Sequence, residues 1–366
     1  MVTGAIDVCI LGYITDDFYV SYEKDEVKDP VTIDVPGGIT TYSSKVSTAL
    51  GYRTGIVATV GEDFFNKEKF ESLRKDKMLD LRGVVAEGEK TTNLYLIIPA
   101  HGYTIGILRH LRENILPKHI PAEYLMARAM HIGPLVGEVP LDTVKFIKEH
   151  SKTAVISLDV QSYVRKLNDF SKLETEDYEK LSKYLSDEQM EQFKQERAQL
   201  VKLGSWEECV QFAKFVDIMK ANVYEACSLA GLDIQEEELK ETDNQRIYAY
   251  RALDVLEEKF AEHQHLVFVI TLGEGGALVC QLKGKMHPRI YVPAAPASSV
   301  IDSTGAGDTF MISFLIEYSK TKDLLFSTKY ALATSSVSVE SAGPFPATPG
   351  DVIRRYEEAY GSFFWR

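Results

Sequence analysis

One seven-residue run, Asp302 to Asp308 with the sequence DSTGAGD, restricts the fold of this chain more than any other stretch. The apolar residues 309–316 that follow are typical of a buried helix, so the two glycines lie at an expected helix N-terminus. Free backbone N–H groups and the positive end of the helix dipole bind anions at such a position. Asp308 follows where a carboxylate can accept a proton beside the bound anion, which predicts phosphoryl transfer. A loop whose aspartate merely caps a helix is the alternative interpretation of the Gly-Ala-Gly-Asp core.

Composition excludes several other classes of function. The formal net charge of -13 argues against a protein that binds nucleic acid or anionic membranes, because both need an excess of Lys and Arg. The four cysteines show no Cys-x-x-Cys spacing, which indicates free thiols in a reducing compartment rather than a zinc site or disulfide framework. No run approaches the roughly 18 apolar residues of a membrane span. We therefore expect a soluble cytoplasmic protein.

Short apolar runs alternate with helical patterns along most of the chain. This alternation implies βαβ units, and therefore a mostly parallel sheet flanked by helices in one α/β domain over residues 1–366. The expected strands cover residues 6–14, 56–60, 129–133, 154–159, 218–222, 266–272 and 277–281. The expected helices cover residues 40–51, 66–77, 141–150 and 244–263.

Two regions depart from this rhythm. Residues 31–35 alternate like a half-exposed strand, and residues 93–99 and 104–110 resemble a hairpin, so the three runs predict a small second sheet. Residues 166–205 are rich in Lys, Glu, Asp and Gln, with sparse apolar residues at helical spacing. We expect a charged helical insertion there, with a partner interface as the alternative.

Polar and glycine residues follow the first two expected strands. Asp16 and Asp17 come directly after the run 6–14, and ligands of open α/β sheets bind beyond the carboxyl ends of the strands. Gly37 and Gly38 precede the expected helix 40–51 and could let a ligand reach the backbone. An ordinary solvated turn explains either feature equally simply.

Two further groups suit a phosphate donor. Asn222 and Glu225 supply oxygen atoms of the kind that hold the water shell of magnesium, although Asn-x-x-Glu is also a common capping box. Thr271, Gly273 and Gly276 form a glycine-rich turn that can lie close to a nucleotide, a weak signal when taken alone. The chain has neither a Walker A lysine loop nor the lysine and catalytic-loop motifs of protein kinases, which excludes those two classes of nucleotide site.

Taken in order, these motifs resemble those of the ribokinase-like carbohydrate kinases, also called the phosphofructokinase-B family. The resemblance spans nearly the whole chain and implies a doubly wound α/β domain with a small β lid, here about residues 18–36 and 91–112. It also implies ATP and Mg2+. Asp308 would be the base, Gly305, Ala306 and Gly307 the anion hole, and Asn222 and Glu225 the contacts to magnesium through water. The expected donor contacts are completed by Thr271, Gly273, Gly276 and Thr304.

The resemblance is less specific at the acceptor site. Sugar kinases of this family commonly have an asparagine three residues after the glycine pair, where this chain has Thr41. Residues 159–165 are similar to the Asp-x-Gln-Gly-x-x-Arg stretch of the myo-inositol kinase branch, with Ser162 in place of the usual glycine. The acceptor contacts we expect are Asp17, Gly37, Gly38, Thr41, Gln161 and Arg165. The acceptor itself remains open between a sugar, a cyclitol such as myo-inositol, and a nucleoside.

Three expectations concern binding partners and the rival function. Some members of the family bind a monovalent cation where this chain has residues 335–343. Lid strands of the family often pair between subunits, so the strands expected at 31–35 and 93–110 suggest a homodimer. The rival interpretation is a catalytically silent regulatory protein that keeps the fold and binds a sugar or nucleotide, with residues 166–200 as the binding segment. The retained Asp308 weighs against this rival, because a silent protein needs no proton acceptor.

Overall fold

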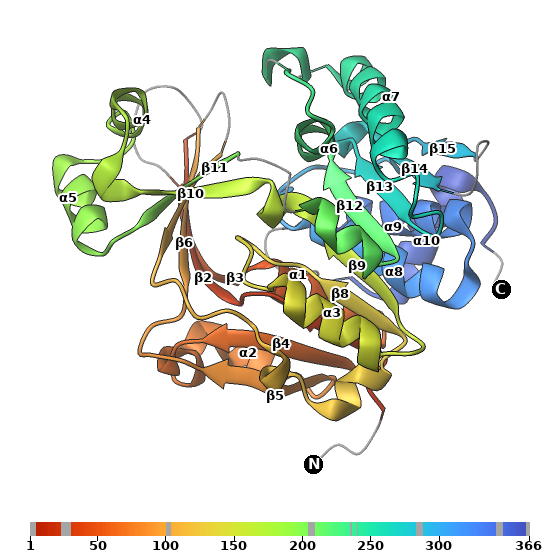
Figure 1. The fold of residues 1–366 in the computed structure, drawn as a ribbon, viewed down its shortest axis with the longest axis horizontal. Helices are drawn as coiled ribbons and strands as arrows, with labels where there is room; N and C mark the ends of the chain where they lie inside the picture. The colour runs from red at the N-terminus through yellow and green to blue at the C-terminus, as the bar shows by residue number, and fades with distance from the viewer. Residues whose placement is uncertain are drawn as a thin grey trace.

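A nine-stranded, mostly parallel sheet forms the centre of the part of the chain that the structure describes. This computed structural model describes residues 5–22, 31–99, 104–203, 209–234, 236–239, 241–282, 288–341 and 347–363. The strand order is β15-β14-β13-β12-β9-β8-β1-β4-β5, and only β14 and β15 run antiparallel to their neighbours (Figure 1). The strands are β1 (Val8–Leu11), β4 (Thr54–Val60), β5 (Leu79–Ala86), β8 (Ala129–Ile132), β9 (Val155–Asp159), β12 (Ile218–Asn222), β13 (Val267–Thr271), β14 (Ala277–Gln281) and β15 (Arg289–Val292). The predicted α/β architecture is confirmed.

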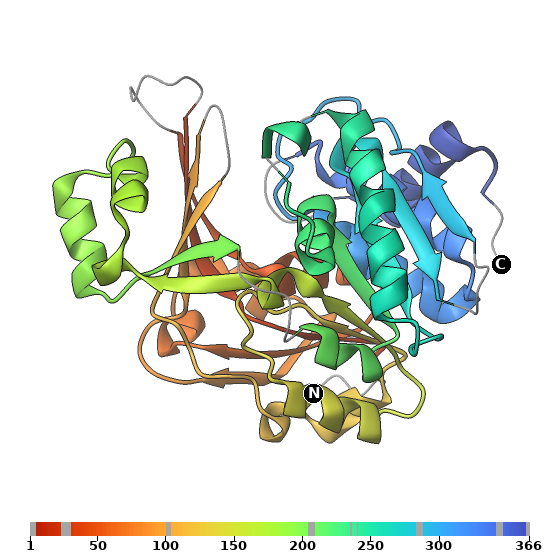
Figure 2. The ribbon, with the colours of Figure 1, turned by 45° about the horizontal axis from the view of Figure 1, so that its top comes forward.

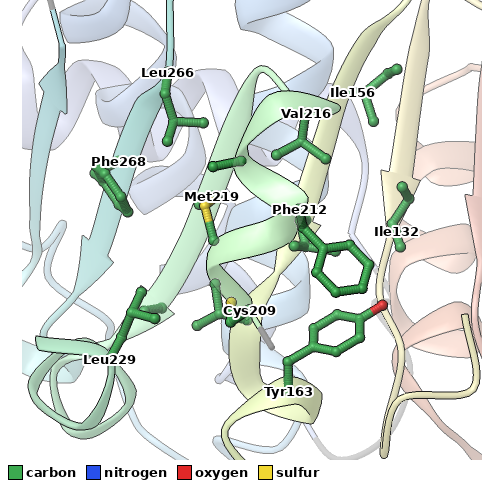
Figure 3. Close-up of a cluster of buried hydrophobic side chains, with 14 of the residues drawn as sticks. Ile132, Ile156, Tyr163, Cys209, Phe212, Val216, Met219, Leu229, Leu266 and Phe268 are labelled. Carbon is green, nitrogen blue, oxygen red and sulfur yellow. The ribbon is translucent and has the colours of Figure 1, made fainter. Parts of the chain in front are cut away.

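Helices cover both faces of this sheet. They are α1 (Ile39–Ala49), α2 (Glu71–Arg74), α3 (Leu141–His150), α6 (Val223–Ala230), α7 (Thr242–Lys259), α8 (Ala306–Thr321), α9 (Leu324–Ser338) and α10 (Pro349–Tyr360). One face packs against α3, α6 and α7 through the apolar cluster that contains Met219, Leu229 and Phe268 (Figure 3). The other face packs against α8, α9 and α10, whose long apolar runs are buried. Burial on both faces explains why the central strands are mostly apolar.

A second sheet of six strands stands beside the main sheet (Figure 2). Its order is β10-β11-β7-β6-β2-β3, with bounds β2 (Thr15–Ser21), β3 (Val31–Gly37), β6 (Asn93–Ile98), β7 (Ile105–Arg109), β10 (Arg165–Asp169) and β11 (Gln199–Leu203). The strands expected at 31–35, 93–99 and 104–110 all belong to it, and β6 and β7 pair antiparallel as a hairpin would. The turn expected at residues 100–103 lies outside the described residues.

The charged segment 166–205 differs from the purely helical insertion that we expected. It contains α4 (Thr175–Leu181) and α5 (Asp187–Gln195), but it begins and ends in strands β10 and β11, which pair with each other and join the small sheet at β7. Its few apolar residues, including Phe170, Leu181 and Phe193, pack on Tyr95 and Ile97 of that sheet. The segment therefore enlarges the small sheet instead of standing free in solvent. It also pairs with β7, so β7 is not the open edge that a dimer through residues 93–110 would need.

Two other expectations were wrong in detail. The first strand ends at Leu11, and Asp16 and Asp17 lie in β2 of the small sheet, because the chain leaves the main sheet at Gly12. The helix expected at 66–77 is broken into short pieces, of which α2 is the longest α-helical one described.

Two further features are the state of the four cysteines and the character of the helices. The four cysteines are free and buried, as predicted. Among the described helices, none combines the length and the apolar character that crossing a membrane requires.

Candidate active site

The run from Asp302 to Asp308 forms the loop and first turn of α8, as predicted. Gly305 is the N-cap residue and has a φ of 75°, a left-handed conformation that favours glycine. Upstream, the Asp302 carboxylate accepts the Thr304 N–H at 2.9 Å, which holds the loop in its turn. The side chain of Ser335 in α9 donates to the carbonyl oxygen of Ala306 at 2.9 Å, so a second helix fixes the same turn. The first turn of α8 is thereby held in the conformation in which helix N-termini bind anions, although the Ala306 N–H itself donates to the Ser303 carbonyl oxygen at 3.2 Å.

Asp308 occupies this first turn in an environment suited to a proton acceptor. Burial raises the pKa of its carboxyl group to about 7, against the opposing effect of Lys220 and Arg165 and with a further rise from Asp159 and Glu225. A carboxyl group with a pKa near neutrality can take up a proton during a reaction and release it afterwards. This is the electrostatic setting that general-base catalysis at neutral pH requires.

Lys220 is a site residue that sequence reasoning missed. Its Nζ lies 2.8 Å from Asp159 Oδ2, and both side chains are almost fully buried. A Cβ placed on Gly307 would lie 3.3 Å from the same Nζ, so the ammonium group sits directly beside the anion-binding turn. Burial lowers the pKa of Lys220, but the carboxylates of Asp159, Glu225 and Asp308 outweigh it and hold that pKa above its usual value. Lys220 is therefore a fixed positive charge, and a lysine inside an otherwise apolar strand was the available signal.

Asn222 and Glu225 meet at the N-terminus of α6. The Asn222 side chain accepts the Glu225 N–H at 2.9 Å, and Glu225 Oε2 accepts the Asn222 N–H at 2.8 Å. The capping-box interpretation is thus correct for the fold, and it leaves the second Glu225 oxygen, Oε1, outside the capping bonds. Burial raises the pKa of Glu225, and the neighbouring Asp159 raises it further.

The donor set fits a magnesium ion that is held largely through water. Within the described ranges, no three His, Cys, Asp or Glu side chains lie close enough together to hold a metal ion by themselves. Magnesium usually keeps several waters and takes one or two carboxylates, so Glu225 with Asn222 is a sufficient protein contribution. The cluster of carboxylates that raises the pKa of Glu225 also favours a nearby cation.

The turn after β13 has two glycines in a left-handed conformation, of which Gly273 is exposed and Gly276 is buried. Gly273 and Gly276 have φ values of 53° and 93°, and a Cβ on Gly276 would overlap the carbonyl oxygen of Val292. Thr271 ends β13 beside Asn222, its register partner at the end of β12. The structure therefore brings the predicted nucleotide turn next to the Asn222–Glu225 pair through two adjacent parallel strands.

The acceptor residues gather where the small sheet meets α1. A Cβ on Gly37 would overlap the Asp17 carboxylate, which shows that the carboxylate lies directly against that glycine. Gly38 caps α1 with a φ of 85°. Thr41 follows in the first turn of α1, fully buried, and its Oγ1 has no hydrogen-bond partner. Burial raises the pKa of Asp17 to about 7, and the hydroxyl of Tyr19 donates to its Oδ2 at 2.9 Å.

Gln161 and Arg165 lie on the segment that links β9 to the small sheet. The Gln161 N–H is bonded to Asp159 Oδ1 at 3.1 Å, which fixes the backbone of the 3-10 helix Val160–Tyr163. Arg165 begins β10 and lines a cavity of about 660 Å³ between the small sheet and α6. Asn222 and Glu225 line the same cavity, whereas Asp17, Gln161 and Asp308 do not. The expected cation segment 335–343 extends beyond the described residues at 342 and 343.

Comparison with known proteins is consistent with this geometry. A model of the pfkB family carbohydrate kinases matches residues 137–349. The chain belongs to this family. The matched region includes Lys220, Asn222, Glu225 and the loop from Asp302 to Asp308, so most of the proposed donor site lies within it.

Known members of the family differ in the molecules that their names mention. A cytidine kinase of Thermococcus kodakarensis is 25% identical over 324 residues, which cover 87% of this chain and 91% of the relative. The structure of Arabidopsis thaliana ribokinase complexed with ribose and ATP matches with a TM-score of 0.65 at 18% identity, covering 97% of this chain and 99% of that chain. A pyrophosphate-dependent kinase complexed with a pyrophosphate analog and myo-inositol matches with a TM-score of 0.62 at 19% identity, covering 92% and 97%. Both structural matches establish a ribokinase-like fold.

Proposed function

We propose that this pfkB-family kinase transfers the γ-phosphoryl group of ATP to a hydroxyl group of a small polyol, with Asp308 as the base. The acceptor class comprises sugars, cyclitols such as myo-inositol, and nucleosides. The observation that carries the proposal is the position of Asp308, whose pKa is raised to about 7 in the first turn of α8, beside Gly307 and Lys220. A proton acceptor and an anion-binding turn then face the same reacting group.

The chemical step follows from these positions. The acceptor hydroxyl loses its proton to Asp308 as its oxygen attacks the γ-phosphorus, and the bond from that phosphorus to the bridging oxygen breaks to release ADP. The N–H groups of Gly305 and Gly307 and the charge of Lys220 stabilise the negative charge on the transferred group. The Ala306 N–H, which donates to the Ser303 carbonyl oxygen at 3.2 Å, joins them only if that bond is given up. Because these groups are already fixed, little reorganisation is needed during transfer.

The remaining residues bind and orient the two substrates. Asp17, Gly37, Gly38, Thr41, Gln161 and Arg165 are the proposed acceptor contacts. The proposed donor contacts are Thr271, Gly273, Gly276 and Thr304. Asn222 and Glu225 would hold magnesium through water, and the ion would supply charge neutralisation to the donor phosphates when bound.

The test is a turnover screen of the purified chain with two donors, ATP and pyrophosphate, and four kinds of acceptor. The acceptors are myo-inositol, ketoses, ribose and nucleosides, and product formation is followed by phosphorus NMR. We expect turnover with ATP, and we expect Asp308→Asn to lower kcat by about 10² to 10⁴-fold. Asp142→Asn, which changes an exposed carboxylate on α3, is the matched control and should leave kcat unchanged.

Three outcomes of the screen would contradict the proposal. An Asp308→Asn variant with most of its turnover would show that Asp308 is not the base. Turnover with pyrophosphate alone would replace ATP as the donor. Binding of acceptor without any turnover would favour the silent regulatory protein.

A further inference from the structure

Two tyrosines cover the carboxylate that we assign to the acceptor. The Tyr19 hydroxyl donates to Asp17 Oδ2 at 2.9 Å, and the Tyr42 hydroxyl lies 3.1 Å from the Tyr19 hydroxyl. When Asp17 is ionised it can only accept, so it takes the single hydrogen of the Tyr19 phenol, and Tyr42 then donates to Tyr19. The result is a directed chain from Tyr42 through Tyr19 to Asp17. The exposed fractions are 2% for Asp17, 4% for Tyr19 and 5% for Tyr42, so none of the three is open to solvent.

Tyr42, the first donor in this series of hydrogen bonds, contacts the anion-binding loop. A Cβ on Gly305 would overlap the ring of Tyr42, which shows that the ring lies directly against that glycine. Burial raises the pKa of Tyr42 above its usual value, and the negative charges of Asp17, Asp302 and Asp308 raise it further. The Tyr42 hydroxyl therefore stays protonated and remains a donor at physiological pH. The two tyrosines thus occupy the space between the acceptor carboxylate and the phosphate loop.

Several buried side-chain oxygens in β2 and α1 lack hydrogen-bond partners. Thr15 Oγ1 is one of them, and the two that belong to the proposed acceptor contacts are Asp17 Oδ1 and Thr41 Oγ1. Each such atom costs a protein about 1–3 kcal/mol, so unpaired atoms in a native structure call for an explanation. Hydroxyl groups of a polyol would satisfy both atoms, because a hydroxyl can donate to a carboxylate and can exchange hydrogen bonds with a threonine.

We propose that Tyr19 and Tyr42 form a gate over the acceptor site, which the acceptor opens by replacing the Tyr19 hydroxyl as the donor to Asp17. This inference rests on the proposed function, because it needs a hydroxyl-bearing acceptor. The gate keeps Asp17 and the phosphate loop apart from water until an acceptor enters, which limits transfer of the phosphoryl group to water. Tyr19 and Tyr42 are then specificity-determining residues, since only an acceptor that replaces the bond to Asp17 opens the site.

The experiment measures acceptor binding after removal of single hydroxyl groups. Tyr19→Phe keeps the ring but removes the bond that the acceptor must break. We therefore expect the KM for the acceptor, and its calorimetric Kd without donor, to fall by about tenfold while kcat changes little. Tyr42→Phe removes only the donor to Tyr19 and should lower KM by a smaller factor. Measurements at about pH 9 keep Asp17 ionised even though losing a hydrogen bond raises its pKa further.

Tyr22→Phe is the matched control. Tyr22 also lies at the end of the small sheet and donates to the Tyr184 carbonyl oxygen at 3.2 Å, but it packs on the outer face with α4 and α5. Its removal should leave KM unchanged. The KM for the donor should stay constant in all three variants, and circular dichroism and Tm establish that each variant folds. If Tyr19→Phe does not fold, Tyr42→Phe still tests the gate.

The outcomes separate the gate from the kinase itself. A higher acceptor KM in Tyr19→Phe would make Tyr19 a direct ligand and overturn the gate. An unchanged KM with a lower Tm would show that the tyrosines are structural only. In both cases the wild-type turnover would leave the proposed function intact. If the wild-type chain phosphorylated no acceptor at all, the proposed function would be wrong, and the gate, which depends on that function, would be wrong as well.

Discussion

Asp308→Asn should make this protein more stable and less active at the same time. Burial raises the pKa of Asp308 from 3.8 to about 7 in the folded state. The folded chain therefore binds this proton more tightly than the unfolded chain does. As the pH rises from about 4 to about 7, the unfolded state ionises first, and the free energy of unfolding falls across that window. Asparagine never ionises, so the variant avoids this loss.

The size of the effect follows from the shift. A rise of about 3 pKa units corresponds to about 4 kcal/mol at 1.36 kcal/mol per unit, and partial solvent access to Asp308 reduces this to about 2–4 kcal/mol. We expect Asp308→Asn to exceed the wild type in unfolding free energy by this amount at about pH 8.5 and by almost nothing at about pH 4. Wild-type kcat/KM should rise with pH in the window where stability falls, because the ionised carboxylate is the base.

Urea titration of both proteins at the two pH values measures the difference directly. Titrating groups that do not interact with Asp308 contribute equally to both proteins and cancel in the comparison, whereas Lys220 and Glu225 interact with Asp308 and do not cancel fully. The surface variant Asp142→Asn should change the unfolding free energy by less than about 0.5 kcal/mol at either pH. A difference between Asp308→Asn and the wild type that does not depend on pH would refute the raised pKa and, with it, the electrostatic basis of the proposed mechanism.

Two further substitutions test the anion-binding turn and the charge beside it. Gly305→Ala should lower kcat by about 100-fold, because the new Cβ overlaps the Tyr42 ring and disturbs the N-terminus of α8; Gly137→Ala is the control, since Gly137 also has a positive φ but no atom within 4 Å of the added Cβ. Lys220→Met should lower the unfolding free energy by about 3–5 kcal/mol in urea titrations, because it leaves the fully buried Asp159 without its partner. Lys145→Met, which breaks an exposed pair with Asp142, should cost at most about 1 kcal/mol. Equal losses of unfolding free energy in Lys220→Met and Lys145→Met would contradict the buried ion pair of Lys220. Equal kcat values for Gly305→Ala and Gly137→Ala would contradict the role of Gly305 in the anion-binding turn.

The sequence was sufficient where a local pattern determines the local structure. The glycines of DSTGAGD, followed by an apolar helix, predicted the N-terminus of α8, and Asn222 with Glu225 predicted the start of α6. Both depend on residues that lie within one turn of each other. The same holds for the hairpin of β6 and β7, whose strands are close neighbours in the chain.

The sequence was insufficient where the outcome depends on which strands become neighbours. Lys220 meets Asp159 because β12 lies next to β9 in register, and the sequence separation of 61 positions carries no sign of that order. Asp17 was placed after the first strand because residues 6–14 are mostly apolar, although the chain leaves the main sheet at Gly12. Strands β10 and β11 were missed because charged residues conceal their alternation. Leu200 of β11 packs with Tyr95 and Ile97, and Leu167 of β10 and Val201 of β11 pack on the separate cluster of Leu94 and Leu108.

The short connection between β9 and β10 links the main sheet directly to the small sheet. One end is anchored, because the Tyr163 hydroxyl donates to the Val139 carbonyl oxygen at 2.7 Å and its ring packs on Phe212. The other end is Arg165, which is both the first residue of β10 and part of the cavity wall beside Glu225. A displacement of the small sheet that carried β10 with it would therefore move the positive charge of Arg165 relative to Asn222 and Glu225. The position of the small sheet and the charge beside the donor site are in this way linked through one residue.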